Sequence, residues 1–314
     1  MSGALKGRRA GVAGLVMLVT LAAFCFIGPL LYHTDQTQAN VALTNMAPSA
    51  AHPLGTDANG YDVLGRLMAG GQISLEIGLA VGILATALGA AWGALAGLTG
   101  GALDALMMRV VDTLLALPAI FVLIYLATVV QPTVPLLIGV IALLSWLAPA
   151  RLIRSQTLSL RTREFVTAAR AAGSGQARTI TRHILPNAAG TLVVAATFQI
   201  ADAILILATL SFLGFGPAPP TATWGGMLYQ GTSYLLDGYW WEVYPAGLMI
   251  VLTVLALNLV GERSRESLDG PPRPGRAQRS SDSGRSAGAE TVSGVPGSGS
   301  SQAAKTSPSR GSWL

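Results

Sequence analysis

The sequence has few of the residues on which most catalytic and metal sites depend. It contains one cysteine, Cys25, which excludes an intrachain disulfide framework and a cysteine-rich metal site. Its two lysines are Lys6 and Lys305, and neither stands in the G-x-x-x-x-G-K-[ST] pattern that cradles ATP phosphates. No nucleophile–base pair, catalytic carboxylate pair or metal-ligand cluster stands out. We therefore expect no enzyme activity, metal or cofactor in this chain, and any ATP that drives it must be bound by another protein.

Charge is scarce as well. Only 11% of the 314 residues are charged, whereas a soluble domain carries about 25%. Hydrophobic residues make up 51% of the chain, and the mean hydropathy is +0.53. One water-soluble core cannot hide this much apolar sequence, so the composition predicts an all-α polytopic membrane protein.

Five apolar segments can supply six membrane-spanning helices, since one span needs about 20 mostly apolar residues. The segment at residues 113–150 carries no charge and is long enough for two spans. Gln131, Pro132 and Pro135 mark a reversal between them, because proline breaks a helix. The other four spans are expected at residues 10–34, 77–103, 188–210 and 243–261. The basic residues before the first span suggest a signal peptide, but its length favours an uncleaved anchor.

The basic residues are distributed unevenly around these spans. If both termini are cytoplasmic, 19 of the 20 Lys and Arg residues fall on the cytoplasmic side and only Arg66 lies outside. The positive-inside rule predicts this asymmetry. The net charge of +5 then belongs to cytoplasmic loops beside anionic membrane lipid, so we expect no nucleic-acid partner.

The chain divides into three predicted regions. Residues 1–72 hold the first transmembrane helix and an external segment, and residues 73–269 form the membrane core with a cytoplasmic loop at 151–187. Residues 270–314 are predicted to be a disordered cytoplasmic tail, because 23 of residues 271–314 are Ser, Gly or Pro.

The cytoplasmic loop is longer than a connection needs and contains a predicted amphipathic helix. Its apolar face, at spacing i, i+3, i+4 and i+7, comprises Phe165, Ala168, Ala169 and Ala172. Glu164 stands at the favourable N-terminal end, and Gly173 and Gly175 can take positive φ and end the helix. The residues alone leave two interpretations open. An alanine face lets another protein approach closely, but an amphipathic helix can also lie on lipid headgroups.

The pattern T-A-A-x3-G from Thr167, followed after nine residues by H-I-L-P from His183, is similar to the EAA loop of ABC-importer permeases. In that family the loop forms a coupling helix that docks in a groove of the cytoplasmic ATPase subunit. Thr167 replaces the glutamate that names the loop, and His183 replaces a usual isoleucine. By this resemblance the ATPase-coupling residues are Glu164, Phe165, Thr167, Ala168, Ala169, Arg170, Ala172 and Gly173.

Two further stretches resemble one branch of that family, the second permease of dipeptide, oligopeptide and nickel importers. One is H-P-L-G-T-D from His52 with the segment that follows it, and the other is L-S-F-L-G-F-G from Leu210. The resemblance covers residues 1 to about 270. The chain departs from the family at Tyr61, commonly arginine, and at Leu207, often glutamate.

The resemblance implies a type I ABC-importer permease fold in the bacterial inner membrane. It implies a subunit that imports di- or oligopeptides together with a homologous second permease, two ATPases that bind ATP and Mg, and an extracytoplasmic substrate-binding protein. Nickel is the competing cargo. An autonomous secondary transporter would show inverted repeats, of which we find no convincing example, and a sensor or scaffold would leave the loop motif unexplained.

Several acidic residues remain as candidate sites. Asp57 and Asp62 could be external metal ligands, but neighbouring glycines favour a turn and an N-cap for a helix starting near Val63. Asp202 lies inside the fifth span and is the candidate for the translocation path, with a contact to the partner permease as its alternative. Asp112 is expected to pair with Arg109 on a helix surface.

Aromatic residues near the membrane surface and glycines inside the second span have structural roles in this prediction. The aromatic side chains of residues 211–242 are expected to be interfacial anchors, with reception of a binding protein as the alternative. Glycines at four-residue spacing in the second span predict close helix packing rather than a site, at Gly78, Gly82, Gly89, Gly93 and Gly97.

Overall fold

Four long helices in the computed structural model are apolar enough to cross a membrane. They are α1 (Ser2–Leu31), α2 (Val63–Thr99), α10 (Ala189–Phe212) and α12 (Tyr244–Asp269). The structure describes residues 2–36 and 38–269, most of which are helical, with one isolated β-bridge between Thr56 and Asp62. The four helices overlap the first, second, fifth and sixth predicted spans. The predicted disordered tail, residues 270–314, lies outside the described residues.

Two bent helix pairs stand where the third and fourth spans were expected. The pairs are α3 (Gly101–Leu115) with α4 (Ala119–Val129), bent by 74°, and α5 (Val134–Ser145) with α6 (Leu147–Leu160), bent by 43°. By length and composition, the described residues contain four helices able to span a membrane, or up to six if each bent pair is one span. The reversal predicted at Pro132 and Pro135 falls between α4 and α5 and is confirmed.

The predicted limits of this region, residues 113–150, are wrong at both ends. Charged residues are absent from that stretch, but the helices continue into charged sequence on either side, to Gly101 and to Leu160. Ion pairs between α3 and α6 compensate these charges. Pro118 stands at the break of the first pair, where a ring without an N–H cannot continue α3.

Helix α2 begins at Val63, the start that the N-cap prediction gave and ahead of the apolar span expected from residue 77, because Asp62 caps it. The Asp62 Oδ1 accepts the backbone N–H of Gly65 at 2.7 Å, which confirms the predicted N-cap. The Asp62 Oδ2 accepts the Tyr32 hydroxyl at 2.8 Å and lies 2.8 Å from Nδ1 of His52. One carboxylate thus ties the end of α1 and the loop before α2 to the start of that helix. At its other end α2 finishes at Thr99, before the predicted residue 103. The next two residues, Gly100 and Gly101, have φ of +67° and +61°, which ends the helix.

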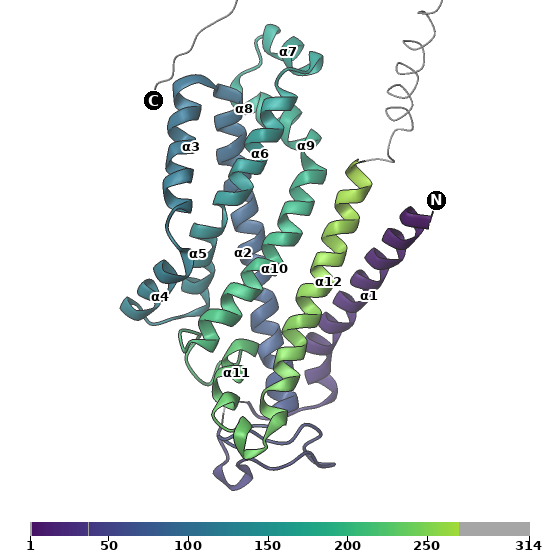
Figure 1. Cartoon of the computed structure of the whole chain (residues 1–314), viewed down its shortest axis with the longest axis vertical. Helices are drawn as coiled ribbons and strands as arrows, with labels where there is room; N and C mark the ends of the chain where they lie inside the picture. Colours follow the sequence, from purple (N-terminus) through teal and green to yellow (C-terminus); the bar gives the residue numbers. More distant parts are fainter. Residues whose placement is uncertain (1, 37, 270–314) are drawn as a thin grey trace, which may run out of the picture. The chain divides into compact units, whose positions relative to one another are not determined.

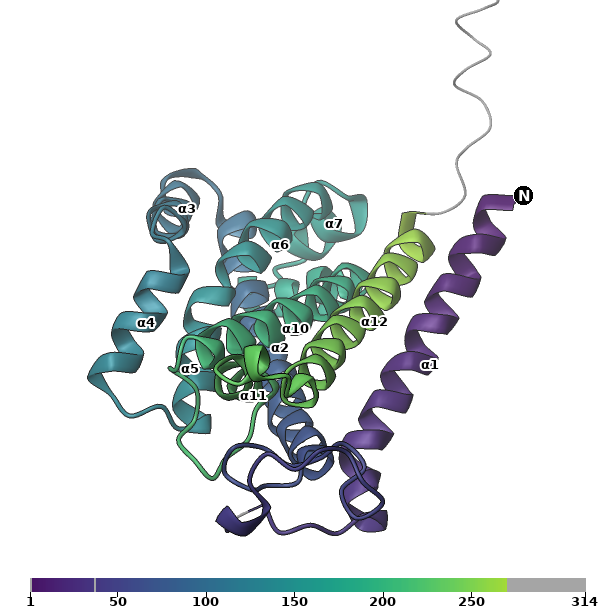
Figure 2. The same ribbon diagram turned by 60° about the horizontal axis from the view of Figure 1, so that its bottom comes forward.

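Glycines on two faces of α2 let neighbouring helices approach closely, as predicted. The face against α6 carries Gly89, Gly93 and Gly97. A Cβ on Gly93 would meet the backbone of Ala150 and Arg154. Another face carries Gly78 and Gly82, which lie against isoleucines of α10. Helix α2 therefore lies at the centre of the bundle, between α6 and α10 (Figures 1 and 2).

Helices α1 and α12 pack side by side and antiparallel (Figures 1 and 2). Gly11, near the start of α1, lies against Arg263, near the end of α12. Gly28, near the end of α1, lies against Met68 at the start of α2. The start of α1 and the end of α12 are therefore at the end of the bundle where α2 finishes.

Short helices cover the opposite end of the bundle. They are η1 (Val41–Leu43), α11 (Trp224–Thr232), η3 (Leu235–Asp237) and η4 (Trp240–Glu242). Trp224 is fully buried, and its Nε1–H donates to the carbonyl of Leu67 at 2.9 Å. Trp241 is also buried and donates to the carbonyl of Thr56 at 3.2 Å.

The interfacial-anchor prediction is therefore wrong for these two tryptophans. Both join sequence-distant segments through the core, because a buried indole that keeps its hydrogen bond is stable there. Tyr229 and Trp240 are exposed, with 54% and 48% of their surface accessible, and retain the anchor interpretation.

Candidate functional site

The segment between α6 and α10 is largely helical rather than an open loop. Its elements are α7 (Glu164–Ala171), α8 (Gln176–Thr179), the π-helix η2 (Ile180–Ile184) and α9 (Leu185–Asn187). Residues 151–160 of the predicted cytoplasmic loop, 151–187, belong to α6. Figure 1 shows α7 projecting at one end of the bundle, away from α11.

Helix α7 is attached to the bundle by one side and exposes the rest. Val166 is its one fully buried residue. The predicted apolar face is turned outward, since Phe165 is 42% exposed and Ala168 and Ala172 are exposed, with Ala169 half-buried. The remaining predicted coupling residues, Glu164, Thr167, Arg170 and Gly173, are exposed as well. The described chain thus leaves this face open to another surface.

Gly173 ends α7 in the backbone geometry that the sequence predicts. Its φ is +85°, and its N–H donates to the carbonyl of Arg170 at 3.0 Å, while the Ser174 N–H donates to the carbonyl of Ala169 at 3.0 Å. These two bonds form a Schellman motif, in which glycine is favoured because it has no Cβ. The same prediction is wrong for Gly175, whose φ is −67° and which precedes α8 as its N-cap.

The second half of the segment is anchored to the core. Ile184 is fully buried in a cluster with Leu98 of α2 and Ile153 of α6. The ring of His183 lies 6.5 Å from the ring of Phe165, centroid to centroid. The chain that follows α7 is therefore held by α2 and α6, the same helices that carry the glycine contact.

One ion pair and one hydrogen bond, both made by arginines, clamp the second half of α6, which leads into α7. The Arg154 guanidinium is bidentate on Asp104 of α3, with Nε–Oδ1 at 2.5 Å and Nη2–Oδ2 at 2.7 Å. Arg161, just past the end of α6, donates from Nη1 to the carbonyl of Gly97 at 2.9 Å. Planar bidentate pairs fix direction as well as distance. The contacts of Arg154 and Arg161 therefore orient α6 where it leads into α7.

A second ion pair lies farther out on the same helices. Asp112 pairs with Arg151 of α6, with Nη2–Oδ1 at 2.5 Å, and not with Arg109 as predicted. The i+3 neighbour was the nearest partner in the sequence, but the side-by-side packing of α3 and α6 brings Arg151 closer.

We predict that Asp104→Asn destabilises the protein more than Asp112→Asn does. The Asp104 side chain is 10% exposed and holds two charge-assisted bonds, so we expect a loss of about 1.5–3 kcal/mol. The Asp112 pair is more than half exposed on both sides, so we expect about 0–1 kcal/mol. Thermal unfolding of both variants in detergent measures the difference, and equal melting temperatures would contradict the clamp.

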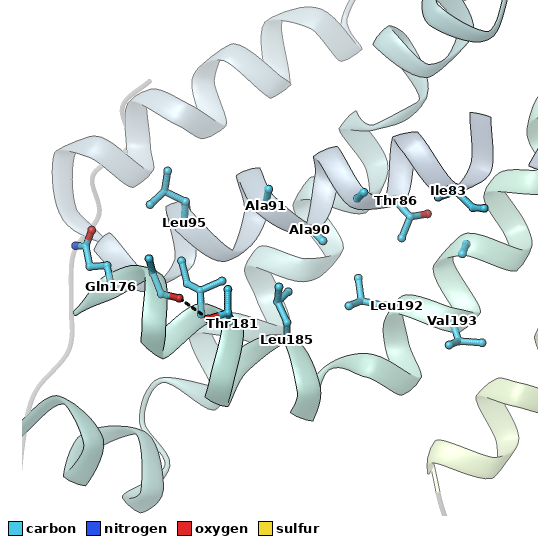
Figure 3. A pocket seen from close by; sticks show the side chains of 14 residues that line it. Ile83, Thr86, Ala90, Ala91, Leu95, Gln176, Thr181, Leu185, Leu192 and Val193 are labelled. Carbon is cyan, nitrogen blue, oxygen red and sulfur yellow. Dashed lines mark hydrogen bonds between the residues drawn. The ribbon is translucent and has the colours of Figure 1, made fainter. Parts of the chain in front are cut away.

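An apolar groove runs beside the connecting segment. Its volume is about 790 Å³, and it lies between α2, the α8–η2 turn and α10. Figure 3 shows Leu95, Ala91 and Ile83 of α2 on one wall, and Leu185, Leu192 and Val193 on the other. Gln176 and Thr181 supply polar groups near one end.

The predicted site residue Asp202 lies on the exposed face of α10, between the buried Ala201 and Ala203. Its carboxylate therefore points away from the core of this chain. Asp57 makes the predicted turn, because its Oδ1 accepts the N–H groups of Asn59 and Tyr61, both at 2.9 Å.

Comparison with known proteins identifies the family. Residues 89–270 match the family of binding-protein-dependent transport system inner membrane components, and residues 4–48 match the N-terminal transmembrane domain of oligopeptide transport permease C. The chain belongs to this permease family. It is 40% identical over 263 residues to the oligopeptide transport system permease protein OppC of Escherichia coli K12, covering 83% of this chain and 87% of that protein. A Brucella suis protein provisionally named a peptide permease is 42% identical over the same shares.

Some features of this permease have a signal in the sequence and others have none. The predicted coupling residues form a local pattern in the sequence. The Asp104–Arg154 clamp does not, since its partners lie 50 positions apart and the only signal was a charge at each helix end. The groove of Figure 3 had no sequence signal, because its lining is as apolar as a lipid-facing surface.

Proposed function

We propose that this permease is the transmembrane subunit of an ATP-driven ABC importer for di- and oligopeptides. The observation that carries the proposal is α7. It is an exposed, Schellman-capped helix with one buried anchor, held on clamped helices at one end of the bundle. The relatives named as peptide permeases support the cargo.

The proposed topology has six spans with both termini in the cytoplasm of a bacterium. The start of α1 and the end of α12 lie at the end of the bundle that carries α7, which supports a common side. Counting each bent pair as one span gives six. The distribution of Lys and Arg supports a cytoplasmic location for that side.

The proposed machine contains other subunits. A homologous second permease completes the translocation path, two ATPases bind ATP and Mg, and an extracytoplasmic binding protein delivers the peptide. This chain itself is non-catalytic and holds no cofactor. We place the second permease against the groove of Figure 3 and the exposed face of α10 that bears Asp202.

In the proposed mechanism ATP closes the ATPase pair, and α7 transmits that movement as a rigid lever. Its motion passes to α6 and α2 through the Ile184 cluster, and from α6 to α3 through the Arg154–Asp104 pair. The two permeases then change from an inward-open to an outward-open state. ATP can drive this change only by binding one state more tightly than the other.

Affinity purification of the tagged chain in mild detergent tests the assembly. We expect a second permease and P-loop ATPases to co-purify, and Ala168→Cys to cross-link to an ATPase. Cys25 is fully buried and is the one cysteine of the chain, so it gives a low background. An isolated chain with no ATPase after cross-linking would contradict the proposal and favour a secondary transporter. ATP-dependent uptake of nickel in place of peptide would identify the alternative cargo.

A further inference from the structure

A small polar cavity lies at the end of the bundle opposite α7. Its volume is about 380 Å³. Its polar side chains come from Arg66 of α2, Ser211 of α10, Tyr229 and Gln230 of α11, and Thr221 and Thr223 before α11. The segment between α10 and α11 forms much of its wall. The start of α2 therefore meets the α10–α11 region, which is distant in the sequence, around one space.

Arg66 is a buried cation whose ion pair with Asp57 is not a hydrogen bond within the described residues. It is 3% exposed, and its Nε and Nη1 atoms make no hydrogen bond within the described residues. Its nearest carboxylate is Asp57, with Nε–Oδ2 at 3.5 Å, and its guanidinium lies 4.4 Å from the ring centroid of Tyr61. A buried charge is costly unless it is paired and hydrogen-bonded.

Asp57 compensates this charge only in part. Its Oδ1 is already used by two backbone N–H groups. Burial raises the pKa of Asp57, whereas three backbone N–H groups and the Arg66 guanidinium oppose that rise. The guanidinium therefore keeps donors that an anion in the cavity could accept.

Ser211 offers a second free group to the same cavity. It is 2% exposed, and its hydroxyl has no hydrogen-bond partner within the described residues. Other buried side chains, such as Glu242, also have polar atoms without a partner, but Arg66 and Ser211 line the same cavity, where one polar ligand can satisfy both. A guanidinium with a neighbouring hydroxyl matches a carboxylate, which accepts several donors at once.

We propose that this cavity binds the C-terminal carboxylate of a peptide during its passage. The inference rests on the proposed function and adds a subsite to it. The volume is at the lower end of the range for small-ligand sites, so it suits one end of a peptide and not a lobe of a protein. In the proposed topology Arg66 is the one basic residue on the external side, where an incoming peptide arrives.

The test compares trialanine with its C-terminal amide, each supplied to the complete importer in proteoliposomes. The binding protein is the same in every assay, so a change in the acid-to-amide uptake ratio reports on the permease. We expect Ser211→Ala and Arg66→Gln each to lower this ratio about 10-fold or more, the range for losing one hydrogen bond to a charged group. Thr253→Val is the matched control, because it removes a buried hydroxyl of α12 outside the cavity.

A wild-type ratio in Ser211→Ala would overturn the carboxylate subsite while leaving the importer function intact. If Arg66→Gln fails to insert, Ser211→Ala decides the question, because it removes one oxygen from a cavity wall. A wild-type chain that imports neither peptide would overturn the proposed function and the subsite together.

Discussion

Gly173→Val is expected to reduce transport and substrate-stimulated ATP hydrolysis about tenfold while the protein still inserts. The left-handed backbone at Gly173 costs a residue with a Cβ about 1–2 kcal/mol, and a β-branched residue more. Helix α7 has eight residues and one buried side chain, so little else stabilises its end. A loss of 1.4 kcal/mol corresponds to about a tenfold fall in the equilibrium ratio of capped to uncapped helix.

The neighbouring Gly175 provides the matched control. A Cβ would find nothing within 4 Å at either glycine, so valine fits sterically at both positions. Only the backbone differs, since φ is +85° at Gly173 and −67° at Gly175. Gly175→Val should therefore retain most activity, and Gly173→Asn should be intermediate because asparagine tolerates positive φ. Equal losses in both valine variants would contradict the capping argument.

Gly173→Asp separates the cap from the docking surface. Aspartate also tolerates positive φ, so its backbone cost is smaller than that of valine. We expect Gly173→Asp to uncouple transport at normal expression, because it adds a charge on the face that we propose meets the ATPase. Normal uptake by this variant would remove Gly173 from the coupling surface.

Local backbone chemistry was predictable from the sequence. The cap at Asp62, the reversal at Pro132 and the turn at Gly173 depend on a few adjacent residues, and the structure has all three. The amphipathic pattern of α7 likewise indicated its open face. The glycines of α2 predicted close packing, because few other roles explain small residues at four-residue spacing.

Tertiary partners could not be predicted in the same way. Hydropathy shows where apolar sequence ends, but α2, α3 and α6 continue beyond it because Asp62 and the α3–α6 ion pairs stabilise charged ends. Trp224 looked like an interfacial anchor, since nothing nearby in the sequence reveals its bond to Leu67, 157 positions away. Arg66 looked like an ordinary external charge, and only the fold shows that it is buried.

Gly93→Val is expected to have the largest effect on folding. A Cβ at Gly93 would meet the backbone N of Arg154 at 2.8 Å and the carbonyl of Ala150 at closer range. Backbone atoms cannot rotate away as a side chain can, so α6 itself must shift. Overpacking of a tight contact costs about 1–3 kcal/mol or more, and we expect a marked fall in the folded fraction recovered in detergent.

The matched control is Gly139→Val on α5, where a Cβ would find nothing within 4 Å. Both substitutions place valine in an apolar helix, so insertion and helix propensity change alike and only the contact differs. The same shift of α6 would also displace Arg154 from Asp104, so any Gly93→Val protein that does fold should lose coupling as well as stability. Full transport by a stably folded Gly93→Val variant would show that α7 does not depend on the α2–α6 contact, and the lever mechanism would then fail.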